Sequence, residues 1–233
     1  RIIIAGDGVE ALQLVRSHVP DIIVSDVMMP RMNGYKLCKT IKEDINISHI
    51  PVILLTARDD RQSQISGYKN GADGYLSKPF EVEMLMELIR NRLKNREYTK
   101  KRYLNAGLIP TPEESTISLT DETFLIKLNS IIQENIENSN LGIQFICQEV
   151  GLGRSSLYNK LKALTGMGAN EYISKLRIEK AITLISGTDM PFSEIAEKTG
   201  FTTPSYFSTA FKQYTGETPS QYKERKKKGL ADK

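Results

Sequence analysis

Residues 22–30 read Ile-Ile-Val-Ser-Asp-Val-Met-Met-Pro, and this stretch decides the fold of the first part of the chain. A short apolar run that ends in polar residues and a proline is typical of a buried strand that closes in a turn. Strands that alternate with helices predict a parallel sheet covered by helices. We expect further strands at residues 2–4, 52–55 and 74–76, and helices near 8–17, 34–43, 59–70 and 81–96.

Three of these apolar runs are followed by polar residues of complementary chemistry. Asp26 follows the second run, Thr56 the third and Lys78 the fourth. Because the carboxyl ends of parallel strands meet at one edge of the sheet, we expect the three side chains to converge. Such a set can accept a phosphoryl group on the aspartate while the hydroxyl and the ammonium neutralise its oxygens. Taken singly, each residue also fits an ordinary turn, cap or solvated position.

The motifs D-x-M-M-P at 26–30, T-A at 56–57 and K-P-F at 78–80 together resemble the receiver domain of bacterial response regulators, over about residues 1–96. The resemblance implies a flavodoxin-like parallel sheet with Asp26 as phosphoacceptor. It further implies that Thr56 is a switch hydroxyl, that Lys78 pairs with the phosphate before a cis proline, and that Tyr75 turns inward on phosphorylation. Magnesium would be held by Asp26 and the backbone carbonyl of Met28.

The resemblance departs from the family at the start of the chain. Receivers open with a strand that ends in an acidic pair for magnesium, whereas residues 1–4 match the second strand of the family. Asp7 follows the wrong strand and is not assigned as a ligand. We therefore expect a receiver without its first strand and helix, a gap in its sheet, and a chain that belongs to a longer protein. On this hypothesis magnesium binding and efficient phosphorylation require a complete receiver.

The charge changes along the 233 residues, which carry 32 basic and 28 acidic side chains in total. Residues 1–89 hold 10 basic and 12 acidic residues, whereas residues 151–230 hold 13 basic and 7 acidic residues. This asymmetry favours two domains with different partners, the second binding a polyanion, although a solvated basic surface explains it equally well. The spaced prolines within 99–120 predict a linker between a domain at 1–98 and another at 121–228.

Several classes of protein are not expected from the composition. No apolar run approaches the roughly 18 residues that a membrane-spanning helix needs, so we expect no membrane contact by this chain. The two cysteines, Cys38 and Cys147, are far apart, and neither histidine has a partner at metal-ligand spacing. A disulfide framework and a zinc site are therefore not predicted.

An internal repeat organises the second half of the chain. Ile146 and Gly151 recur 49 positions later as Ile195 and Gly200, and the apolar pattern of 157–166 recurs at 207–216. A short helix, a glycine and a second helix predict a helix-turn-helix, here at about 142–166 and again at about 191–216. The periodicity of 169–186 predicts one long helix that holds the two motifs at a fixed distance.

The exposed face of each second helix is small, hydrogen-bonding and basic, as a helix in the major groove requires. A plain helical bundle with two similar hairpins is the alternative. The predicted DNA contacts are Arg154, Ser155, Tyr158, Asn159 and Lys162 in the first motif, and Ser205, Ser208, Thr209 and Lys212 in the second.

Residues 121–226 resemble the AraC-type DNA-binding domain. The resemblance rests on L-Y-N-K-L-K at 157–162 with T-G at 165–166, and in the second copy on I-A at 195–196, G-F at 200–201, Y-F-S at 206–208 and T-P-S-Q-Y at 218–222. It implies that both recognition helices enter successive major-groove segments, about 34 Å apart. Gly153 stands where the family often has a serine cap, and Thr209 where a basic residue is common.

The two resemblances together imply a phosphorylation-regulated, sequence-specific transcription regulator of a two-component system. We expect double-stranded DNA and a histidine kinase as partners, a homodimer as the active form, and no enzymatic activity of this chain. The order of domains also resembles the end of hybrid sensor kinases, in which case a cytoplasmic chain would be tethered to the inner membrane through its longer parent. The alternatives are a DNA-binding protein with a degenerate receiver and an aspartyl phosphohydrolase.

Overall fold

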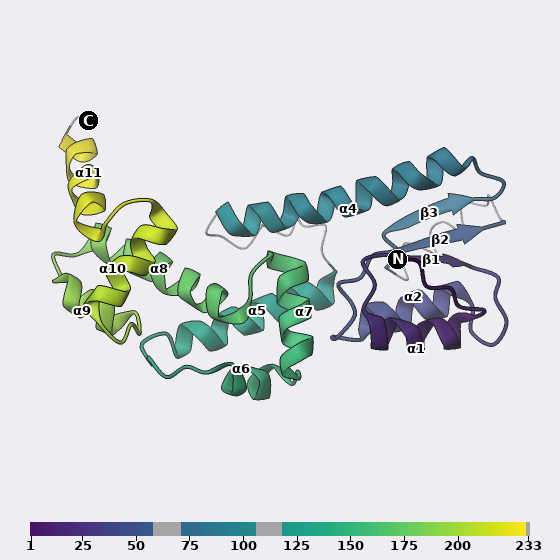
Figure 1. Ribbon diagram of the computed structural model, residues 1–233, viewed down its shortest axis with the longest axis horizontal. Helices are drawn as coiled ribbons and strands as arrows, with labels where there is room; N and C mark the ends of the chain where they lie inside the picture. The colour runs from purple at the N-terminus through teal and green to yellow at the C-terminus, as the bar shows by residue number, and fades with distance from the viewer. Residues whose placement is uncertain (58–70, 106–117, 232–233) are drawn as a thin grey trace. The chain divides into compact units, whose positions relative to one another are not determined.

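The computed structural model describes residues 1–57, 71–105 and 118–231 (Figure 1). The chain forms two compact units. The first comprises Arg1–Leu125 and Asn159–Gly166, and the second comprises Ile126–Tyr158 and Met167–Lys233. The boundaries at 98 and 121 remain predictions.

A three-stranded parallel sheet lies at the centre of the first unit, as the sequence predicted. The strands β1 (Ile23–Asp26), β2 (Val52–Thr56) and β3 (Gly74–Ser77) are hydrogen-bonded in the order β1-β2-β3. In this register Asp26 pairs with Leu55 and Thr56 pairs with Ser77, so the three strands end together. The common edge of the sheet is thus the place where polar residues after each strand meet.

Helices cover both faces of this sheet. Helices α1 (Gly8–His18) and α2 (Gly34–Glu43) lie on one face, and α4 (Val82–Asn105) lies on the other (Figure 1). The side chains of Leu37, Cys38 and Ile41 on α2 are fully buried against the sheet. Burial of one apolar face of each helix is the main source of stability in such layered folds.

Residues 2–4 do not form the strand that the sequence predicted. The segment is irregular, and the exposed fractions of the surfaces of Ile2 and Ile4 are 88% and 83%. An extended segment becomes a strand only when a neighbour pairs with its backbone groups, and no described strand pairs with this one. The expected helix at 59–70 lies outside the described residues. The last predicted helix of this part extends beyond 96, because α4 continues to Asn105 and so includes 99–105 of the predicted linker.

The second half is helical throughout, as predicted. Its elements are α5 (Leu119–Glu134), α6 (Ile143–Val150), α7 (Arg154–Thr165), α8 (Ala169–Gly187), α9 (Phe192–Lys198), α10 (Pro204–Thr215) and α11 (Pro219–Ala231). The pairs α6–α7 and α9–α10 form the two predicted helix-turn-helix motifs, and α8 is the long helix between them. Phe207 and Phe211 on α10 are fully buried and pack edge-on with a centroid distance of 5.7 Å.

Gly200 shows why the turn of the second motif needs a glycine. Its φ of +70° lies in the left-handed region, and a Cβ at this position would come within 2.2 Å of the carbonyl oxygen of Ile136. Only a residue without a side chain satisfies both conditions. Gly151 occupies the equivalent turn of the first motif with φ +73°.

Candidate functional site

The sheet edge brings together the residues that the sequence placed after the strands. Lys78 forms an ion pair with the carboxylate of Asp26, and its backbone N–H donates to the carbonyl oxygen of Thr56 at 2.6 Å. Thr56 itself is buried, with 3% of its surface exposed. The Lys78–Pro79 peptide bond is cis, as the resemblance implied. A carboxylate and an ammonium thus face each other beside a hydroxyl-bearing residue.

The carboxylate of Asp26 is held in its ionised form. Burial acts to raise its pKa, but hydrogen bonds from Lys78 and from the backbone N–H of Met28 act against burial and prevail, so the pKa lies below its ordinary value. The Met28 N–H donates to Oδ1 at 3.1 Å. At neutral pH Asp26 is therefore an anion with one oxygen on Lys78 and the side chain 36% exposed. An ionised and accessible carboxylate oxygen is what nucleophilic attack on phosphorus requires.

Tyr75, the predicted switch residue, lies on β3 and is half-buried. Its hydroxyl lies 2.9 Å from the hydroxyl of Tyr35 on α2. This hydrogen bond fixes the orientation of the ring relative to the helix that follows Asp26. Tyr35 was not among the predicted site residues, because a contact between residues 40 positions apart leaves no periodic signal.

Gly34 was also missed by the sequence reasoning. A Cβ on Gly34 would lie 2.3 Å from the carbonyl oxygen of Asp26, so α2 can begin beside the site only with a glycine here. Asn33 caps the helix by accepting from the N–H of Lys36 at 2.9 Å. A motif of Asn-Gly a few residues after a strand-end aspartate was the signal that could have found it.

Asp7 caps a helix and takes no part in the Asp26–Lys78 pair. It caps α1 by accepting from the N–H groups of Val9 and Glu10 at 2.8 and 3.2 Å, and it forms an ion pair with Arg31. Among the described residues no group of three or more His, Cys, Asp or Glu side chains is placed to hold a metal ion. Asp26 and the Met28 carbonyl alone do not make a complete magnesium site.

The first predicted DNA-reading helix, α7, has two distinct faces. Leu157 and Leu161 are buried, whereas all of the predicted contact residues are exposed: Arg154, Ser155, Tyr158, Asn159 and Lys162. Arg154 donates to the side chain of Gln144 on α6 at 2.6 Å, which orients its guanidinium. The exposed face therefore offers donors and acceptors that can reach base edges and phosphates.

The second predicted reading helix, α10, begins at a well-formed cap. Thr203 accepts from the N–H of Tyr206 at 3.2 Å, and Pro204 occupies the first turn. Ser205, Thr209 and Lys212 are exposed and Ser208 is half-buried. Tyr206 is 54% exposed, whereas Phe207 and Phe211 on the same helix are fully buried and fill the core.

Comparisons with known proteins place this chain in a family. Residues 1–90 match the model of the response regulator receiver domain, and residues 146–225 match a helix-turn-helix domain. The probable transcriptional regulator ycf29 of Pyropia yezoensis is 30% identical over 181 residues, which are 73% of this chain and 82% of that protein. The chain belongs to the response-regulator family of transcription regulators.

Two further relatives match different lengths of this response regulator. Histidine kinase P4 of Formosa agariphila is 42% identical over 96% of the chain, and the matched part spans 16% of that kinase. The C-terminal domain of AraT, a response regulator from Geobacillus stearothermophilus, is 31% identical with a TM-score of 0.41, over 44% of this chain and 84% of that domain.

Within residues 1–57, 71–105 and 118–231, no helix combines the length and the apolar character that a membrane crossing requires.

A fully buried lysine–aspartate pair of the response regulator lies inside the first unit and was not predicted. The ammonium of Lys160 is fully buried, forms an ion pair with Asp121 and donates to the hydroxyl of Ser48 at 2.8 Å. Ser48 in turn donates to Asp121 at 2.7 Å. Lys160 also lies over the ring of Phe124, 5.1 Å from its centroid. We call Ser48, Asp121 and Lys160 the inner triad.

Proposed function

We propose that this response regulator binds double-stranded DNA in a sequence-specific manner through the exposed faces of α7 and α10. The observation that carries the proposal is the presence of two helix-turn-helix motifs whose second helices each expose small polar and basic side chains. Asn159 has the donor and acceptor geometry to pair with adenine, and Arg154 can contact guanine or phosphate. Lys162 and Lys212 supply positive charge toward the phosphate backbone.

We further propose that Asp26 accepts the phosphoryl group. An oxygen of Asp26 would attack the phosphorus of a phosphohistidine donor, so that a phosphorus–oxygen bond forms as the phosphorus–nitrogen bond breaks and the histidine ring takes up a proton. Lys78 and Thr56 would then neutralise the oxygens of the acyl phosphate. Movement of Thr56 and Tyr75 toward the phosphate would change the surface of α4 and favour dimers on paired DNA sites.

The donor is a histidine kinase, either separate or on the same polypeptide. The match to 16% of a much longer histidine kinase supports the second arrangement. In that case the chain acts at the cytoplasmic end of a hybrid signalling protein. This chain itself would contribute a phosphoacceptor and a DNA reader, with magnesium bound only by a complete receiver.

Selection of binding sites from a random DNA pool tests this proposal. We expect the full chain to enrich two short motifs about one helical turn apart, with affinity that falls steeply as salt rises. In a matched selection, the Asn159→Ala variant should lose its base preference in only one of the two DNA motifs. Failure of the parent chain to enrich any sequence would refute the DNA-reading assignment.

A further inference from the structure

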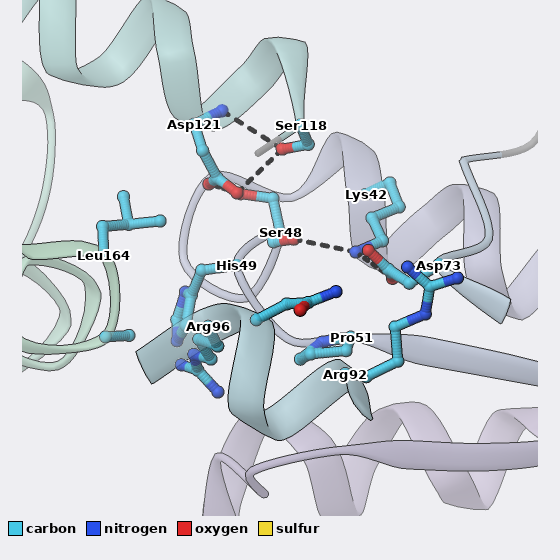
Figure 2. A pocket seen from close by; sticks show the side chains of 12 residues that line it. Lys42, Ser48, His49, Pro51, Asp73, Arg92, Arg96, Ser118, Asp121 and Leu164 are labelled. Carbon is cyan, nitrogen blue, oxygen red and sulfur yellow. Dashed lines mark hydrogen bonds and ion pairs between the residues drawn. The ribbon is translucent and has the colours of Figure 1, made fainter. Parts of the chain in front are cut away.

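A small cavity in the first unit lies away from the phosphoacceptor edge and has no part in the proposed function (Figure 2). Its volume is about 70 Å³. It is enclosed by α4, by the segment before β2, by the start of α5 and by the end of α7. The lining residues are Lys42, Ser48, His49, Pro51, Asp73, Arg92, Asn95, Arg96, Ser118, Asp121, Ala163 and Leu164.

Two buried side-chain nitrogens on the cavity wall have no hydrogen-bond partner among the residues that the structure describes. They are Nδ1 of His49 and Nε of Arg92. His49 is 7% exposed, so water outside the protein does not satisfy its ring. Buried polar atoms are nearly always hydrogen-bonded, and a donor that is left without a partner costs about 1–3 kcal/mol. A ligand that accepts hydrogen bonds would remove this cost at both positions.

The charges around the cavity indicate the sign of that ligand. Each carboxylate on the wall already has its own cation, since Asp73 lies 2.7 Å from Lys42 and Asp121 pairs with Lys160. Arg92 and Arg96 have no carboxylate within ion-pair distance in the described part of the chain. Arg96 donates to the backbone carbonyl of Asp21 at 3.1 Å. Two guanidinium groups therefore line the cavity without a direct ion pair among the described residues.

The protonation state of His49 fits an anionic ligand. Burial and then the positive charges of Lys160 and Arg96 lower the pKa of His49 to about 3, against a weaker opposing effect of Asp121. The ring is therefore neutral at physiological pH and carries one N–H. Placed on Nδ1, this N–H can donate into the cavity. Figure 2 shows His49 and Arg96 together on one side and Arg92 beside Asp73 on the other.

We propose that this cavity binds a small tetrahedral oxyanion, inorganic phosphate or sulfate, through Arg92, Arg96 and the Nδ1–H of His49. A cavity of about 70 Å³ exceeds the roughly 10–15 Å³ that one ordered water needs, so it has room for one small ion but not for a large ester. Guanidinium groups match the oxygens of phosphate and sulfate in geometry as well as in charge. The carboxylates of Asp73 and Asp121 limit the site to one anion.

Nitrogen NMR of the histidine rings tests the proposal on the intact chain. The sequence contains only two histidines, and His18 is exposed on α1, so it serves as an internal control. Titration with sodium phosphate at fixed pH should shift the ring nitrogens of His49 in a saturable way and leave His18 unmoved. Sulfate should compete, whereas phenyl phosphate should not. Sodium chloride at equal ionic strength should produce no saturable shift.

Two arginine variants on the same helix sharpen the test. Loss of one charged hydrogen bond in Arg92→Gln should weaken phosphate binding about tenfold. Arg90→Gln should bind like the parent, because Arg90 is exposed and pairs with Glu87 at 2.9 Å. Equal shifts with chloride and phosphate, no shift of His49, or identical affinity of the two variants would overturn the proposal. If Arg92→Gln does not fold, the titration of the parent chain decides alone.

Discussion

Two of the lysine–aspartate pairs, the outer pair Lys78–Asp26 and the inner pair Lys160–Asp121, differ sharply in their surroundings. In the outer pair, 39% of Lys78 and 36% of Asp26 are exposed, whereas in the inner pair the values are 0% for Lys160 and 3% for Asp121. Water screens the outer pair, so it adds about 1 kcal/mol or less to stability. The inner pair has lost its water and depends on hydrogen bonds from its neighbours. The same two charges are thus available for chemistry at the surface and serve folding in the interior.

The pKa directions follow the same contrast. Burial raises the pKa of Asp121, but the charge and hydrogen bond of Lys160 and the hydroxyls of Ser48 and Ser118 outweigh it, so the pKa is lowered overall. Burial is the largest influence on Lys160 and lowers its pKa despite Asp121. The inner lysine therefore keeps its charge only as long as its partners stay in place.

Removal of the inner lysine should have the largest effect. In Lys160→Met the carboxylate of Asp121 stays buried without its cation, and we expect a loss of about 3–5 kcal/mol in the free energy of unfolding. Urea denaturation measures this loss. Lys162→Met, two positions along the same helix and exposed, is the control and should stay within about 0.5 kcal/mol of the parent. Similar losses of stability in both variants would contradict the claim that the buried carboxylate of Asp121 depends on the charge of Lys160.

The pH dependence of His49 should come next. Because its pKa is about 3 in the folded chain and about 6.5 in the unfolded chain, its contribution to stability is complete above pH 6.5 and is lost as the pH falls toward 3. From pH 7 to pH 5 the parent should lose about 2 kcal/mol more than a His49→Gln variant. Parallel stability curves for the two proteins would contradict this, and His18→Gln provides the control for an exposed histidine.

Loss of the serine in the inner triad should cost less. Ser48→Ala removes one hydrogen bond to Asp121 and one from Lys160 but leaves the charges paired, so we expect a loss of about 1.5 kcal/mol. The hydroxyl of Ser17 is exposed and bonds within its own helix, to the carbonyls of Gln13 and Leu14 and to the ring of His18. Ser17→Ala should therefore be nearly neutral when both variants are measured by urea denaturation. An equal loss in Ser17→Ala would contradict the role given to Ser48.

The outer pair should matter least for stability and most for phosphorylation. Lys78→Ala and Asp26→Asn should each change the free energy of unfolding by about 1 kcal/mol or less. Asp26→Asn removes the nucleophilic oxygen, so any phosphate incorporated from a donor kinase into the parent should be absent from this variant. Label that remains in Asp26→Asn would place the phosphoacceptor elsewhere.

Sequence reasoning located the outer pair but not the inner triad, and the reason is physical. Asp26 and Lys78 follow two strands of one parallel sheet, and topology alone brings such residues together. Ser48 and Lys160 are 112 positions apart, and no periodicity connects them. The spacing of Lys160 from Leu157 and Leu161 does place it on the buried face of α7, so its burial could have been anticipated.

The strand expected at residues 2–4 failed for a different reason. Its apolar composition is correct for a strand, but composition does not supply the neighbour whose backbone must pair with it. The helix-turn-helix motifs, in contrast, were predictable because each is local in sequence and closes on a glycine such as Gly200.

The most direct test of the account is the affinity of the chain for the DNA site obtained by selection, measured for the parent, Asn159→Ala and Asn170→Ala. Both asparagines are exposed at helical positions, but only Asn159 lies on the predicted reading face of α7. We predict that Asn159→Ala weakens binding by about 1–3 kcal/mol and relaxes specificity at one base pair, while Asn170→Ala binds like the parent. Equal affinities for all three proteins would contradict the claim that α7 reads DNA.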